Sequence, residues 1–83
     1  MTDRLAKILL DMRHNANDIR FTDLLFVCRH YFGEPRLQGT SHYVFKMPWS
    51  GDPRVNVQNK GGKAKPYQVK QVLTAIKKWE ERS

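Results

Sequence analysis

The spacing of apolar residues changes partway along the chain, and this change constrains the fold more than any other feature. Up to about residue 32 the apolar residues recur every three or four positions, which is typical of amphipathic helices. Between residues 36 and 58 they alternate with polar residues, which is typical of strands with one buried face. After residue 66 the helical spacing returns. We therefore expect an α+β fold, in which helices flank a small sheet.

Capping residues, glycine and proline set the expected limits of these elements. Thr22 is a plausible N-cap for the second helix, with Phe21 and Phe26 at the spacing of a hydrophobic staple. Gly33 ends that helix, and Pro66 suits the first position of the last one. The expected elements are helices at 3–15 and about 23–32, strands at 36–38, 41–47 and 54–58, a loop at 59–65 and a helix from 66 to about 80.

Three short strands joined by tight turns predict a three-stranded antiparallel sheet. In the central strand, Tyr43, Phe45 and Met47 alternate with His42, Val44 and Lys46. Helices on one face of such a sheet bury their apolar stripes there and leave the other face open. The order α-α-β-β-β-α contains, within residues 21–80, the α-β-β-β-α layout of a double-stranded-RNA-binding domain. The helix at 3–15 would be an addition to that core.

Size and charge narrow the class of protein. The 83 residues fit a single domain over 1–83, and 15 Lys and Arg against 8 Asp and Glu give a net charge of +7. This excess predicts an anionic partner, although a basic surface without a partner is the alternative. Cys28 is the only cysteine and lies in an apolar run, so we expect an inert buried thiol and a reducing, cytoplasmic location. The apolar cluster at 8–10 is too short for a signal peptide or a membrane span.

His42 lies near the start of the central strand, directly after Gly39, Thr40 and Ser41. Because strand side chains alternate, His42 is expected on the open face, opposite to Phe45. An imidazole exchanges protons near neutral pH, so His42 is a candidate general base or acid. Gly39 permits the close approach of a phosphate, and Thr40 and Ser41 offer hydroxyl and amide donors to an anionic oxygen. The alternative is a surface histidine without a chemical role.

Three lysines without an intervening acidic residue occupy the loop before the last helix, namely Lys60, Lys63 and Lys65. The loop also holds two adjacent glycines and leads into a helix N-terminus, where amide groups and the helix dipole favour anions. We expect it to bind phosphate with an affinity that falls as salt rises. A solvated loop is the alternative, and the spacing of a nucleotide-binding P-loop is absent. No spacing of His and Cys predicts a metal site or another cofactor, and no pair of carboxylates predicts a hydrolase of the two-carboxylate type.

The stretch Gly39-Thr40-Ser41-His42-Tyr43-Val44-Phe45 resembles the G-S/T-S/x-H-x-x-F signature of the HicA toxins. The similarity continues through residues 55–58 and 61–69 and covers roughly residues 21–76. The resemblance implies a small, ribosome-independent mRNA interferase with a double-stranded-RNA-binding-like fold, whose catalytic histidine matches His42. It also implies a HicB-type antitoxin as protein partner, with DNA contacted only indirectly through the antitoxin complex and no membrane association.

The chemistry of RNA fits this activity, because the 2′-OH is a nucleophile within the substrate. An enzyme then needs a base, which His42 can supply, and cations to balance the charge on phosphorus, for which Lys63 and Lys65 are candidates. No metal is required, and DNA lacks the nucleophile. Two alternatives remain open, a non-catalytic module that binds structured RNA and a domain whose basic face meets an acidic protein.

Overall fold

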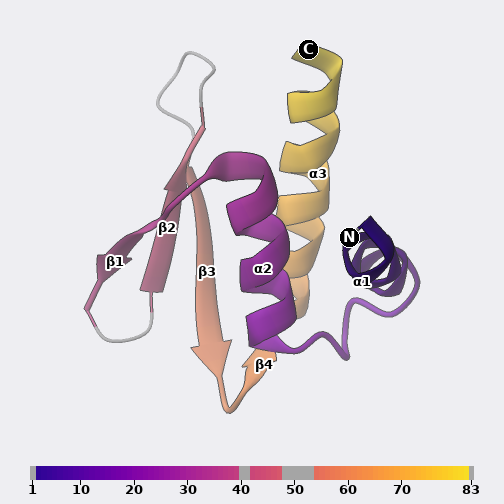
Figure 1. Ribbon diagram of the computed structural model, residues 1–83. Helices are drawn as coiled ribbons and strands as arrows, with labels where there is room; N and C mark the ends of the chain where they lie inside the picture. Colours follow the sequence, from indigo (N-terminus) through magenta and orange to yellow (C-terminus); the bar gives the residue numbers. More distant parts are fainter. Residues whose placement is uncertain (1, 40–41, 48–53, 83) are drawn as a thin grey trace.

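The computed structural model describes residues 2–39, 42–47 and 54–82, which form three helices and a four-stranded antiparallel sheet of order β1-β2-β3-β4 (Figure 1). The elements are α1 (Thr2–His14), α2 (Phe21–Phe32), β1 (Arg36–Gln38), β2 (His42–Lys46), β3 (Arg54–Lys60), β4 (Lys63–Ala64) and α3 (Pro66–Arg82). The α+β class is confirmed. Thr40, Ser41 and the expected turn at 48–53, including Trp49, lie outside the described residues.

The three helices lie on the same side of the sheet (Figure 1). Between them and the sheet lies one apolar core, to which every helix contributes. Phe45, Val57 and Val69 are fully buried there, from β2, β3 and α3. Met12 of α1 is fully buried as well, so the N-terminal helix completes the core rather than standing apart from it. No helix within the described ranges is long and apolar enough to cross a membrane.

The start of α2 differs from the expected one. The helix begins at Phe21 after Arg20, which has extended backbone angles and makes no side-chain capping bond. The prediction of Thr22 as N-cap with Phe21 outside the helix is therefore wrong. The N–H of Phe21 donates to the carbonyl of Gly62 (N···O 3.0 Å), so a distant turn, rather than a local hydroxyl, satisfies this first amide.

A fourth strand occupies the segment expected to be a loop. β3 runs on to Lys60, and Gly61 and Gly62 turn the chain so that Lys63 pairs with Lys60. Both glycines have positive φ, 61° and 87°, as a two-residue type I′ hairpin requires. The prediction of three strands is therefore wrong in number, although β1, β2 and β3 lie within one or two residues of their expected limits.

Alternation along β2 and β3 separates two faces of the sheet. Phe45, Val55 and Val57 face the helices and are buried. His42 and Lys46 lie on the other face and are exposed, as alternation predicts. This second face is not covered by any described helix (Figure 1). We call it the open face.

Candidate functional site

Cross-strand pairing arranges the side chains of the open face in three rows. His42 stands between Gln38 of β1 and Gln58 of β3. Val44 stands between Arg36 and Asn56, and Lys46 stands opposite Arg54. Directly paired residues in a sheet point to the same side, with Cβ atoms about 5 Å apart. The open face is therefore polar around His42 and increasingly cationic toward Lys46.

His42 lines a hollow of about 290 Å³ between the open face and the first turns of α3. Four residues of β3 contribute to its wall, and two exposed residues of α3, Tyr67 and Gln71, form the opposite side. The residues of β3 are Arg54, Asn56, Val57 and Gln58. The hollow is partly open to solvent. Arg54 is the cationic residue among the described lining residues, and it stands four residues along β3 from Gln58, the partner of His42.

Gln68 fixes the position of α3 against this part of the sheet. It is the buried polar residue of the described chain, and its Oε1 accepts a hydrogen bond from the backbone N–H of Gln58 (2.9 Å). Gln58 is the residue that pairs with His42 in the sheet. A helix side chain therefore satisfies this backbone N–H at the edge of β3. The same contact brings the first turn of α3 beside His42.

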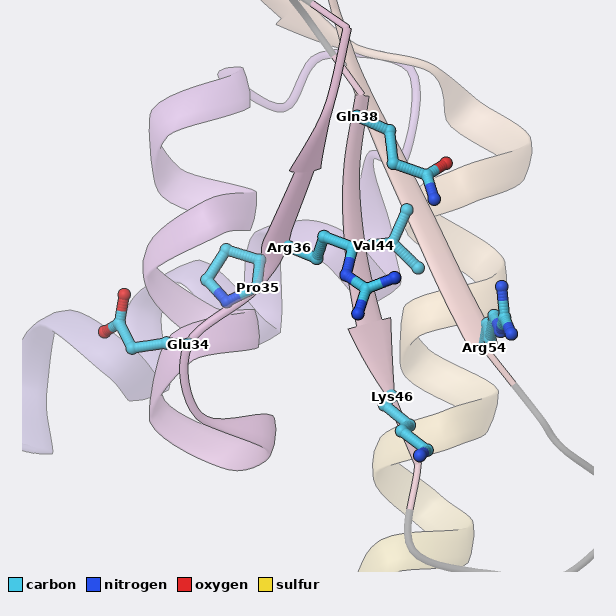
Figure 2. Close-up of a pocket in the computed structure, with 7 residues that line it drawn as sticks. All are labelled: Glu34, Pro35, Arg36, Gln38, Val44, Lys46 and Arg54. Atoms are coloured by element: carbon cyan, nitrogen blue, oxygen red, sulfur yellow. The ribbon is translucent and has the colours of Figure 1, made fainter.

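A second hollow, of about 310 Å³, lies further along the open face (Figure 2). It surrounds Val44 and is lined by the cations Arg36, Lys46 and Arg54. Figure 2 shows their side chains on the strand face turned away from the helices. Glu34 also lines this hollow, and its carboxylate lies 3.6 Å from the Nε of Arg29. This basic hollow shares Arg54 with the hollow of His42, so the two adjoin at this residue.

The lysines singled out from the sequence lie elsewhere. Lys63 donates to the carboxylate of Asp18 and lines a cleft formed by α1 and residues 18–23. This hydrogen bond, and then the charge of Lys63, lowers the pKa of Asp18 below its ordinary value. Lys60 is exposed at the end of β3, and Lys65 is half-buried. None of these lysines lines the hollow of His42 or the basic hollow.

The expected anion site at the start of α3 is also altered. The N–H groups of Gln68 and Val69 donate to the carbonyl of Lys65 (2.9 and 3.1 Å), so these amides are already engaged. Of the other predicted site residues, Gly39 is exposed in the turn after β1, and Thr40 and Ser41 fall outside the described residues. The structure therefore brings His42 together with Arg54, rather than with the lysines of the hairpin.

The remaining reactive groups of the described chain do not add a second site. Cys28 is buried, and burial raises the pKa of its thiol to about 12, so the thiolate that would act as nucleophile is not formed near neutral pH. No group of three His, Cys, Asp or Glu side chains within the described ranges is arranged to hold a metal ion.

Sequence reasoning placed part of this site and missed the rest. Alternation predicts that Lys46, Arg54 and Gln58 point to the same side as His42, but their grouping depends on the register of β1, β2 and β3. No local sequence pattern predicts Tyr67 and Gln71 as site residues, because their proximity to His42 depends on where α3 crosses the edge of β3. Comparisons with protein-family models, characterised proteins and solved structures returned no match to this chain.

Proposed function

We propose that this protein is a toxin of the HicA type, a metal-independent endoribonuclease that cleaves mRNA on the open face of its sheet. The observation that carries the proposal is the position of His42, exposed on an uncovered face in a hollow that also holds a guanidinium. The resemblance of residues 39–45 to the HicA signature supports the same histidine from an independent direction. A double-stranded-RNA-binding-like core over residues 21–80 belongs to this proposal.

His42 acts as the general base in the proposed reaction. Its imidazole takes the proton from a ribose 2′-OH, and the 2′ oxygen attacks the adjacent phosphorus. The bond from phosphorus to the 5′ oxygen of the next nucleotide breaks, and that oxygen leaves with a proton. The products are a 2′,3′-cyclic phosphate and a 5′-OH. In this proposal Arg54, which lines the same hollow, extends from the level of Lys46 toward His42 and balances the charge that develops on the phosphate oxygens.

The proposed regulation follows from the same surface. A HicB-type antitoxin that covers the open face with carboxylates would meet Arg36, Lys46 and Arg54 and exclude RNA from His42. The partner would therefore be both ligand and inhibitor. Contact with DNA would occur only within that complex.

The test is RNA cleavage by the purified chain in the presence of EDTA, with analysis of the product ends. We expect 2′,3′-cyclic phosphate ends from the wild-type protein and a loss of cleavage of at least about 100-fold in His42→Ala, as for removal of a general base. His14→Ala is the matched control, because His14 is also exposed but lies at the end of α1. Equal cleavage by folded His42→Ala protein would contradict the proposal.

A non-catalytic RNA-binding module is the second candidate. It is favoured by one observation, that the described lining of the His42 hollow contains no carboxylic acid and no second imidazole to protonate the leaving oxygen. In that case wild-type protein and His42→Ala would both bind RNA, and neither would cut it.

A further inference from the structure

We propose that Tyr67 stacks against a nucleobase in the hollow beside His42, so that the RNA is unpaired at the point where it is cut. This inference deepens the proposed function and rests on it for the identity of the ligand. It adds a binding role for α3, which the reaction at His42 does not use.

Tyr67 is unusually exposed for a large aromatic side chain. Its exposed fraction is 63%, and the other exposed large hydrophobic residues of the described chain are Leu10 and Leu37, each at 54%. Of these three, Tyr67 is the one that lines the hollow of His42. An aromatic ring exposed beside a candidate catalytic group offers a flat surface to a base, and stacking on such rings is a general mode of single-strand binding.

The backbone around Tyr67 is held firmly enough to position the ring. Gln68, the next residue, is buried and bonded to the backbone of Gln58. Gln71 follows Tyr67 by four residues, so both side chains lie on the same face of α3. The backbone that carries the ring is therefore fixed beside the hollow, and the Tyr67 hydroxyl accepts a hydrogen bond from the Nε2 of Gln68 (3.4 Å). This anchoring lowers the entropy lost when a base binds.

The rest of the lining suits the edge of a base. Besides Gln68, whose Oε1 is engaged by the backbone of Gln58, three side-chain amides line the hollow, those of Asn56, Gln58 and Gln71. Each amide offers both a donor and an acceptor, as the edges of nucleobases require. A volume of about 290 Å³ lies just below the usual range for ligand sites, about 300–1,000 Å³, and is far too small to enclose a duplex.

Paired bases cannot reach such a site. In an RNA helix the bases are stacked on one another and their Watson–Crick edges are occupied, whereas proteins that read RNA with aromatic rings take bases from loops and single strands. A base held by Tyr67 must therefore be unpaired. We accordingly assign single-stranded RNA, or a loop, as the substrate class.

The experiment compares two single-stranded RNA probes of equal length, one with all of its bases and one with abasic nucleotides that keep every phosphate. Binding is measured with the full chain carrying His42→Ala, so that the probes stay intact. Adding Tyr67→Ala should weaken binding of the complete probe by about 5- to 150-fold, the range for loss of one stacked base. It should leave binding of the abasic probe unchanged, and Tyr67→Phe should retain the affinity.

Leu37→Ala is the matched control, because it removes an exposed apolar side chain outside the hollow. The proposal is overturned if Tyr67→Ala weakens both probes equally or weakens neither. It is also overturned if a duplex binds as tightly as the complete single strand. Cleavage by the wild-type chain, measured in parallel, distinguishes failure of this inference from failure of the proposed function. If RNA binding depends on the bases but the wild-type chain does not cleave, the catalytic function is wrong and the base-binding site at Tyr67 stands.

Discussion

The carboxylates near each cation decide which positive side chains of this protein are available to RNA. Lys63 already donates to Asp18, and Arg4 lies 3.6 Å from the carboxylate of Asp23. Arg36 and Lys46 make no ion pair with a residue of the described ranges, and they stand on the face that carries His42. Because a paired cation must give up one anion to bind another, we expect Arg36 and Lys46 to contribute more to RNA binding than Lys63.

The pair of Asp18 and Lys63 gives a prediction on pH. The hydrogen bond from Lys63, followed by its charge, lowers the pKa of Asp18 in the folded chain. The unfolded chain therefore binds the proton more readily, and the stabilisation is complete above the ordinary pKa of Asp18, 3.8. It is lost as the pH falls from that value through the lower pKa of the folded state.

We expect thermal unfolding to show this window. The melting temperature of Asp18→Asn should lie slightly below that of the wild-type chain at about pH 7, and the difference should shrink as the pH falls below 3.8. The effect is small because both side chains are exposed, and salt should reduce it further. Asp11→Asn is the control, since it removes an exposed carboxylate from the same cleft. A difference that grows on acidification would rule out this origin.

At the scale of elements, the hairpin of β3 and β4 joins three parts of the fold. Its turn carbonyl at Gly62 accepts from the first amide of α2, and the N–H of Ala64 donates to the carbonyl of Ile19. The Oδ1 of Asn59 accepts from the N–H of Gly62 (2.7 Å) and closes the turn. The segment that the sequence predicts to be a lysine-rich loop therefore connects the sheet to the start of α2 through backbone hydrogen bonds.

The two turn glycines should respond differently to substitution. Gly62→Ala places a Cβ at φ of 87°, where no atom lies within 4 Å but the backbone itself is strained, at a cost of about 1–2 kcal/mol. Gly61→Asn creates the Asn-Gly sequence that type I′ turns prefer, at φ of 61°, and should be close to neutral. Urea unfolding of both variants measures the difference, and equal destabilisation would argue against the I′ turn.

The elements also show what the sequence could and could not predict. Periodicity locates three helices and the strands β2 and β3, because each carries enough apolar residues to reveal its spacing, whereas β1 has a single apolar residue, Leu37. β4 has two residues, too few to show a period, so the sequence predicts a loop there. The start of α2 depends on the carbonyl of Gly62, which is distant in sequence and invisible to local capping rules. The face of His42 followed from alternation, whereas the place of Tyr67 required the packing of α3.

At the scale of the whole molecule, the open face is long enough to contact an RNA strand at more than one phosphate. His42 and Lys46 are four residues apart on β2, which is about 13 Å at the rise of a strand. One phosphate cannot contact both, so an RNA strand whose bond is cut at His42 would place a neighbouring phosphate in the basic hollow. Arg54 stands opposite Lys46 in the sheet and lines both hollows.

Contact at more than one phosphate predicts how salt acts on binding. Each phosphate neutralised on a single strand contributes about −0.7 to the slope of log affinity against log salt. In a His42→Ala background, Arg36→Ala with Lys46→Ala should therefore make the slope shallower by about 1.4.

The comparison is Lys63→Ala with Lys65→Ala, which also changes the net charge from +7 to +5, since 7 − 2 = 5. Because the two double variants remove equal charge, long-range attraction falls equally, and any difference between their slopes reports direct contact. A larger change of slope in the variant of Lys63 and Lys65 would indicate that RNA binds at the hairpin rather than on the open face. His42 would then lie away from the bound phosphates.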